Sequence, residues 1–374
     1  MEILNKKVIQ INVETTREII DSLKPTLAEM NIKKIFLESG RRMLLSERRG
    51  MFKVLSKEKT IIDDPINILS FLINPDMEEQ VLQLIINKAN LDMPGRGSIY
   101  SKKLNIYKSH DELLENNVNS IKIDSKNLLS ELKGITCIVQ KGEIEPIGRV
   151  GLDTGTGVPA ITFGTGSGFR DRLGIWRIAV PAEKEICNLS LNHRDCEQIF
   201  NMMIDAGALD HPGKGFIYYF NINKGLLNTK FQIGTINQAA SVEQIITVID
   251  EMKGNSDWRR RELSSGGIVR KRKFLTNLIH FAVSCNEGKA ADLTLAAMNA
   301  GAAGATIFKS KFIDLSNPEK QKITPAREVS NMIIGESTIE KITKELEENN
   351  LFSDEICGQI LMSPVLKACT YLGK

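Results

Sequence analysis

The sequence lacks the features that would assign it to several common classes of protein. Its 374 residues contain no uninterrupted apolar run near the ~18 residues that a membrane-spanning helix needs. The first residues, MEILNKKVIQ, have no hydrophobic signal-peptide core. The net charge of +3 is too small, for this length, to indicate nucleic-acid binding. We therefore expect a soluble cytoplasmic protein with no membrane span, for which a nucleic-acid partner is not expected.

Cysteine and histidine are scarce and scattered. None of the six cysteines forms a Cys-x-x-Cys pair, which indicates reduced, mostly buried thiols. The four histidines show no ligand spacing, although His193 and Cys196 could share a helix face, so we expect no metal site. GTGSGF at 164–169 lacks the third glycine and the opening helix of a dinucleotide fingerprint. Because no catalytic constellation is evident, we do not expect an enzyme.

One ten-residue stretch occurs twice. Residues 91–100 read LDMPGRGSIY and residues 209–218 read LDHPGKGFIY, with seven of ten positions identical, which indicates an internal repeat. In each copy a proline fixes the entry into a turn, and two glycines allow close approach to a ligand. Successive N–H groups can form an anion nest there, and Arg96 or Lys214 can pair with phosphate. The alternative interpretation is a helix-to-strand turn with a solvated cation.

Apolar periodicity predicts one order of elements around each copy: strand, helix, strand, loop, strand, helix, strand. In the first copy a long polar loop covers 39–64, and in the second copy the corresponding loop opens at Gly164. The order is that of a ferredoxin-like α+β domain. A third, degenerate copy follows, whose turn reads EICGQILM and keeps Gly358 but no basic residue.

We therefore predict three ferredoxin-like (βαββαβ) domains, at 1–109, 134–222 and 274–374. A helical connector covers 110–133, and a second connector with basic clusters covers 223–273. We interpret those clusters as a solvated linker, and the alternative is a surface for nucleic acid or another polyanion.

The repeated unit, with Gly-x-Gly before its last strand, resembles the PII family of nitrogen-regulatory signalling proteins. That family has ferredoxin-like subunits close in length to each copy here, and it normally assembles as a homotrimer. A long T-loop joins strands two and three, and nucleotides bind in the clefts between subunits. The resemblance implies that this chain is a whole trimer fused into one polypeptide, an intramolecular pseudo-trimer.

The resemblance also implies a ligand, a partner and a set of site residues. The ligand is an adenine nucleotide (ATP, ADP or AMP), with magnesium left open, and the partner is a protein contacted by the T-loops. No copy has a clear match to the glutamine that 2-oxoglutarate-sensing members use. We expect two competent clefts, because only two turns keep a basic residue. The nucleotide-binding residues implied are Gly95, Arg96 and Gly97 and Gly213, Lys214 and Gly215 in the two turns, with Gly40, Arg41, Arg42, Gly164, Gly166, Gly168 and Arg170 at the T-loop bases.

Two other functional hypotheses remain open. One is a ligand-free structural or scaffolding pseudo-trimer, which the loss of the third turn favours. The other is a metal-binding protein or enzyme on the same trimeric core, as in the related divalent-cation tolerance family. Sparse histidine and unclustered cysteine argue against metal, whereas a basic residue in two of the three turns favours nucleotide binding.

Overall fold

The computed structural model describes residues 6–47, 59–109, 128–168, 183–228, 232–233, 272–316 and 323–372. Within these residues the chain forms three units, each with the order strand, helix, strand, strand, helix, strand. The predicted α+β class and the repeated ferredoxin-like unit are confirmed.

The strands of unit 1 are longer than their counterparts in the other two units. Unit 1 contains β1 (Lys6–Thr15), α1 (Arg17–Glu29), β2 (Lys34–Glu47), β3 (Lys59–Ile73), α2 (Glu78–Ala89) and β4 (Gly97–Ser109). Unit 2 contains β5 (Leu132–Gln140), α3 (Glu145–Thr154), β6 (Ala160–Gly168), β7 (Glu183–Asn192), α4 (His193–Gly207) and β8 (Phe216–Ile222). Unit 3 contains β11 (Leu278–Asn286), α7 (Ala290–Asn299), β12 (Gly304–Asp314), β13 (Ala326–Gly335), α8 (Ile339–Glu348) and β14 (Gln359–Val365).

Each unit has the same strand order in its sheet. The orders are β2-β3-β1-β4, β6-β7-β5-β8 and β12-β13-β11-β14. The first strand of each unit lies in the middle of its sheet, between the third and the fourth, and all of these pairings are antiparallel. The long hairpin formed by the second and third strands therefore stands at one edge of every sheet.

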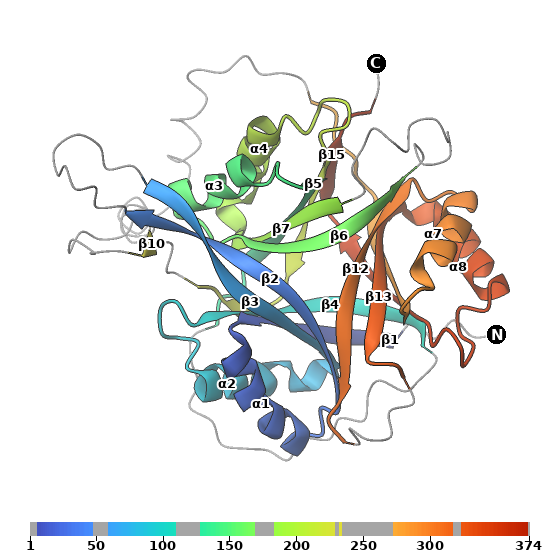
Figure 1. The fold of residues 1–374 in the computed structure, drawn as a ribbon, viewed down its shortest axis with the longest axis horizontal. Coiled ribbons are helices and arrows are strands. Elements are labelled where there is room, and N and C mark those ends of the chain that lie inside the picture. Colours follow the sequence, from blue (N-terminus) through green and yellow to red (C-terminus); the bar gives the residue numbers. More distant parts are fainter. Residues whose placement is uncertain are drawn as a thin grey trace.

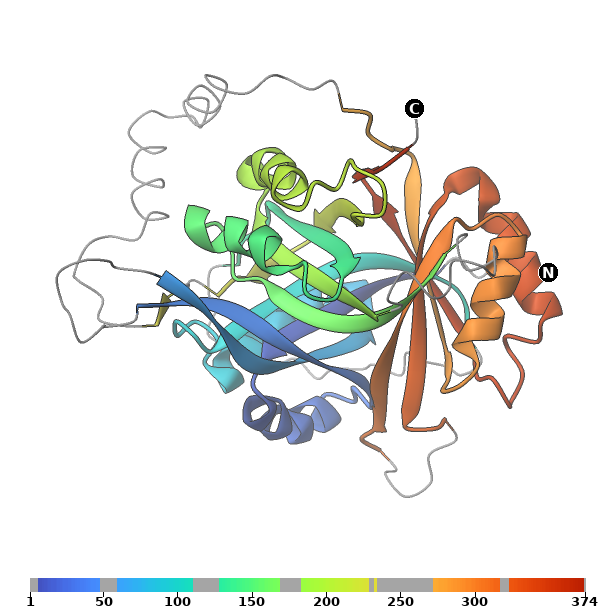
Figure 2. The same ribbon diagram turned by 45° about the horizontal axis from the view of Figure 1, so that its top comes forward.

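The three sheets join around a common centre. Strand β4 pairs with β14, and β12 pairs with both β2 and β6, while β6 also pairs with β2. In the described part of the chain, β1 to β4, β6 and β11 to β14 thus close into a barrel of nine antiparallel strands. The helices lie on the outside, one pair for each unit (Figure 1 and Figure 2).

Each unit has its own apolar core between its sheet and its two helices. In β1 the alternate residues Ile9, Ile11 and Val13 are buried against α1 and α2. Alternation points the intervening residues, Gln10 and Asn12, to the opposite face, at the centre of the molecule. Alternation of polar and apolar residues usually places the polar side chains in solvent, but in β1 it places them in the interior of the barrel.

Short strands tie the units to one another. Strand β9 (Gly225–Leu226), which follows unit 2, pairs with β4 of unit 1. Strand β15 (Lys367–Thr370), which follows unit 3, pairs with β8 of unit 2. Strand β10 (Gln232–Ile233) pairs with β2. All six cysteines are free and buried, as predicted.

The predicted loop boundaries were wrong in both intact copies. The polar loop over 39–64 is largely strand, since β2 runs to Glu47 and β3 begins at Lys59. The reason is packing between units: Met43 and Leu45 of β2 are buried in the core of unit 2. In the second copy β6 continues to Gly168, past the predicted loop start at Gly164, because it pairs with β12. Most of the two predicted connectors lies outside the described residues.

Candidate functional site

The first glycine turn joins the end of α2 to β4. Helix α2 ends at Asn90, which adopts the left-handed conformation (φ 50°) that asparagine tolerates. Gly95 and Gly97 have φ of 87° and 146°. A Cβ at Gly97 would lie 2.2 Å from the carbonyl oxygen of Glu14, so no other residue fits there without movement.

Groups from elsewhere in the chain already contact this turn. The Gly95 N–H donates to Oδ1 of Asn228 at 3.1 Å, and Asn228 comes from the segment after unit 2. Arg96 Nε donates to the Ala89 carbonyl at 2.8 Å, which holds the guanidinium over the end of α2. The turn therefore lies at a boundary between units, and one of its N–H donors is satisfied by a side chain.

The second glycine turn has the same backbone conformation. Gly213 and Gly215 have φ of 76° and 130°, and a Cβ at Gly215 would lie 2.4 Å from the Ile138 carbonyl oxygen. Lys214 Nζ lies 3.0 Å from Oε1 of Glu143, and both side chains are partly exposed. Thr370 of β15 donates to the Gly215 carbonyl at 2.8 Å. This turn too lies at a boundary between units, here with the end of unit 3.

The third turn is built differently. Its Gly358 N–H donates to the Leu351 carbonyl, and Cys357 takes the positive φ of 50°. The buried guanidinium of Arg327 donates to the Cys357 carbonyl at 2.7 Å and to Ser284 at 3.2 Å. The Arg327 side chain therefore lies against the third turn.

The basic residues expected at the T-loop base of copy one lie within β2. Arg41 pairs with Asp63 of β3 and, at 2.8 Å, with Glu185 of unit 2. Glu185 also accepts the Gly142 N–H at 2.8 Å, so this carboxylate joins two units. Arg42 pairs with Asp64 at 2.5 Å, and its Nη1 is buried with no hydrogen-bond partner in the described part of the chain.

The glycines expected at the T-loop base of copy two allow neighbouring strands to approach one another closely. A Cβ at Gly164 would lie 2.9 Å from the Ile307 carbonyl oxygen of β12, and Gly168 pairs with Gly304. On the neighbouring side, a Cβ at Gly40 would lie 2.7 Å from the Ile161 carbonyl oxygen. A Cβ at Gly166 would lie 2.5 Å from the Lys184 side chain. Arg170 lies outside the described residues.

The sheet of unit 1 brings two of the predicted segments to the same end. Gly97 pairs with Thr15, Thr15 pairs with Asn67, and Asn67 pairs with Ser39, next to Gly40. Three strand spacings separate the turn from β2, about 14 Å. The structure does not bring the two intact turns together, since each stands at its own boundary between units.

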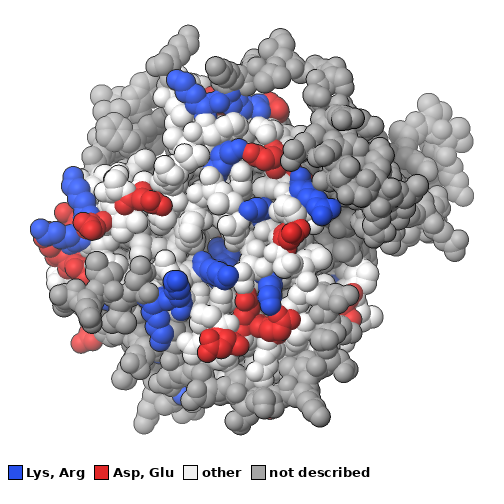
Figure 3. Space-filling model, turned by 180° about the vertical axis from the view of Figure 1, so that it is seen from behind, with Lys and Arg blue, Asp and Glu red and all other residues white. Residues whose placement is uncertain are grey.

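Nothing in the sequence indicates the cavity that lies at the centre of the barrel. It has a volume of ≈ 190 Å³ and is lined by strands of all three units. A second, outer pocket of ≈ 490 Å³ shares Lys102 and Phe220 with it and is also lined by Lys103, Lys133 and His193. On the face turned away from the viewer of Figure 1, Lys and Arg side chains gather around a central hollow (Figure 3).

Comparison with known proteins gives distant likenesses. The sequence matches no protein-family model and no curated protein. Among solved structures, PII of Arabidopsis thaliana bound to citrate is 15% identical with a TM-score of 0.21, over 29% of this chain and 95% of that chain. Aspartate kinase from Synechocystis is 9% identical with a TM-score of 0.21, over 96% of this chain and 46% of that chain. These values describe distant structural similarity alone.

The described residues provide neither a membrane-spanning helix nor a metal site. No helix among them is long and apolar enough to cross a membrane. No group of three or more His, Cys, Asp or Glu side chains among them could hold a metal ion.

Proposed function

We propose that the chain is a small-molecule-binding regulatory protein, built as an intramolecular pseudo-trimer, which acts by binding and not by catalysis. Its ligand is an adenine nucleotide, held with its phosphates on the two glycine turns. Ligand binding would change the affinity of the hairpins between second and third strands for a partner protein. The observation that carries the proposal is that both intact turns combine left-handed glycines, a basic residue and a contact from a neighbouring unit.

A phosphate should bind the second turn at a lower free-energy cost than the first. A phosphate that pairs with Lys214 must displace Glu143, and a surface ion pair of this kind contributes only about 0–1 kcal/mol. At the first turn the phosphate must instead displace the Asn228 side chain from the Gly95 N–H. The two sites should therefore differ in affinity, with the site at Lys214 the tighter.

Calorimetric titration tests the proposal. ATP, ADP and AMP would each be titrated, with and without magnesium, into the wild-type protein and into Arg96→Ala and Lys214→Ala. Lys344→Ala is the matched control, because Lys344 is a highly exposed cation on α8. We expect two sites in the wild type and in the control, and the loss of a different site in each of the other variants. Absence of binding, or equal effects of both substitutions on every site, would contradict the proposal.

A ligand-free structural role is the second candidate. One observation favours it: Gly95, Arg41, Arg42 and Lys214 all have partners within the chain. A folded protein that gives no heat with any of the three nucleotides would support this role.

A further inference from the structure

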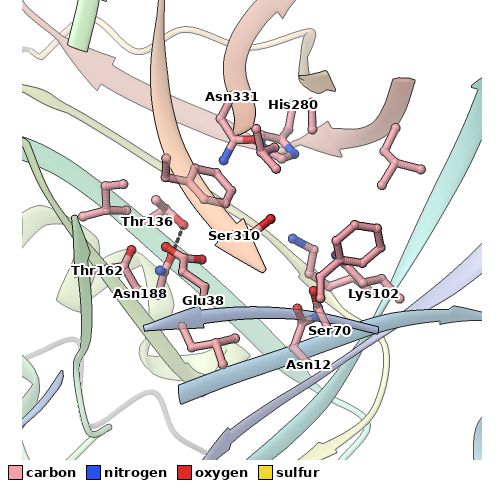
Figure 4. A pocket seen from close by; sticks show the side chains of 18 of the residues that line it. Asn12, Glu38, Ser70, Lys102, Thr136, Thr162, Asn188, His280, Ser310 and Asn331 are labelled. Carbon is pink, nitrogen blue, oxygen red and sulfur yellow. Dashed lines mark hydrogen bonds between the residues drawn. The ribbon is translucent and has the colours of Figure 1, made fainter. Parts of the chain in front are cut away.

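The centre of the barrel holds a cavity whose lining combines polar and apolar side chains. Asn12, Ser70 and Lys102 come from unit 1, Thr136 and Asn188 from unit 2, and His280, Ser310 and Asn331 from unit 3 (Figure 4). Thr136 donates to Asn188 at 2.8 Å. A volume of ≈ 190 Å³ is many times what one water molecule needs, so the space can hold a small organic molecule.

Several polar atoms at this cavity have no partner in the described part of the chain. They are Nδ2 of Asn12, Nε2 of Gln359, Nε2 of His280 and Oγ of Ser310. Asn12 and Gln359 are more than nine-tenths buried, with 7% and 5% of their surface exposed. Burying an amide N–H without an acceptor costs free energy, so these two donors call for an acceptor inside the cavity.

The cavity is also asymmetric, although the fold around it repeats. The shared turn motif aligns Lys102 with Phe220, and the third turn aligns both with Ser363. All three residues line the outer pocket, so they stand at one level around the centre. Cross-strand pairing likewise relates Glu38 in β2 to Thr162 in β6 and Phe308 in β12, and all three line the cavity. A symmetric trimer would place three lysines and three glutamates here, whereas the fused chain places one of each.

The two charged groups stand apart, and neither has an ion-pair partner among the described residues. Glu14 of β1 is a further buried carboxylate, and burial raises its pKa to about 7. Burial lowers the pKa of Lys102 to about 8 and raises the pKa of Glu38 to about 7. The Lys102 ammonium lies 4.4 Å from the centroid of the Phe220 ring. Figure 4 shows Glu38 on one side of the cavity and Lys102 on the other. An anion beside Lys102 would supply the missing countercharge.

Asn12 stands beside Lys102 on the same inner face. Lys102 pairs with Gln10, and Tyr100 pairs with Asn12, so Asn12 and Lys102 are diagonal neighbours on adjacent strands. Side chains at such positions lie about 7–8 Å apart at their origins, within reach of a shared ligand. The Lys102 ammonium and the Asn12 amide N–H can thus donate to the same ligand group, and a carboxylate can accept both hydrogen bonds.

We propose that the central cavity binds a small organic acid, whose carboxylate lies on Lys102 and Asn12 and whose far end donates a hydrogen bond to Glu38. The outer pocket, with Lys103 and Lys133, provides the entrance and attracts anions to it. This site is separate from the two glycine turns, and it does not depend on nucleotide binding.

A set of matched probes tests the chemistry of the ligand. 5-Aminovalerate has a carboxylate and a far donor, valerate lacks the donor, and glutarate replaces it with a second carboxylate. Inorganic phosphate tests for a simple anion. By calorimetry we expect 5-aminovalerate to bind more tightly than valerate, and glutarate to bind least among the carboxylates because it faces Glu38. Phosphate binding without carboxylate binding would overturn the assignment to an organic acid.

Three variants test the position of the ligand. Lys102→Met should weaken 5-aminovalerate binding by at least about tenfold, the loss of one charge-assisted contact. Lys103→Met, which changes the exposed neighbour in the outer pocket, should leave the equilibrium constant within about threefold, because salt screens that contribution. Glu38→Gln should reduce the preference for 5-aminovalerate over valerate. Absence of binding of every probe to the wild type, or unchanged binding by Lys102→Met, would overturn the proposal.

Discussion

Replacing Lys102 by methionine should make the ligand-free protein more stable at neutral pH. Burial lowers the pKa of Lys102 from 10.5 to about 8. Each pKa unit corresponds to about 1.4 kcal/mol, so burying the protonated side chain lowers the free energy of unfolding by up to ~3 kcal/mol. The contact with the Phe220 ring offsets about 0.5–2 kcal/mol of that cost. Methionine keeps the length of the side chain, and we expect a net gain of about 1–2 kcal/mol.

The pH dependence of this gain identifies its cause. Below pH 8 Lys102 is protonated in both the folded and the unfolded chain, so the full cost is present. Between pH 8 and 10.5 the unfolded chain binds more protons, and the stability of the wild type rises with pH. Urea unfolding of the wild type and of Lys102→Met should therefore show a difference at pH 7 that shrinks towards pH 10. A difference that stays constant with pH would refute the electrostatic explanation, and Lys344→Met provides the exposed-lysine control.

Two further substitutions test how the units are held. Gly97→Ala and Gly142→Ala both place a side chain at positive φ, but only at Gly97 would the new Cβ collide with a backbone atom. Urea unfolding should therefore show that Gly97→Ala destabilises the protein by about 2–4 kcal/mol more than Gly142→Ala does. Equal losses would argue against a collision at Gly97. Arg41→Met leaves the buried Glu185 with fewer partners and should cost about 2–4 kcal/mol, whereas Arg149→Met, in an exposed pair, should cost under ~0.5 kcal/mol. Similar costs for the two arginines would contradict the role of Arg41 between units.

The turns and the repeated unit could be predicted because their signals are local. Gly97 and Gly215 both have positive φ and both approach a backbone carbonyl closely, which is the geometry that two glycines at this spacing allow. Apolar periodicity likewise located β1, in which Ile9, Ile11 and Val13 belong to the core of unit 1.

Contacts between units could not be predicted in the same way. Arg41 and Glu185 are 144 positions apart, and nothing in either segment indicates the other. The polar stretch after Ser39 reads as a loop, yet it is strand because it packs on unit 2. Lys102 and Lys103 are adjacent lysines in β4, and only the closed barrel makes the Lys102 side of the strand an interior.

Amide hydrogen exchange with and without ADP shows whether nucleotide phosphates bind the two intact glycine turns. Slower exchange is predicted at 95–97 and at 213–215, where left-handed glycines present their N–H groups. The third turn, at Cys357 and Gly358, serves as the internal reference and should not change. Protection at neither intact turn at saturating ADP, or equal protection at all three turns, would contradict the claim.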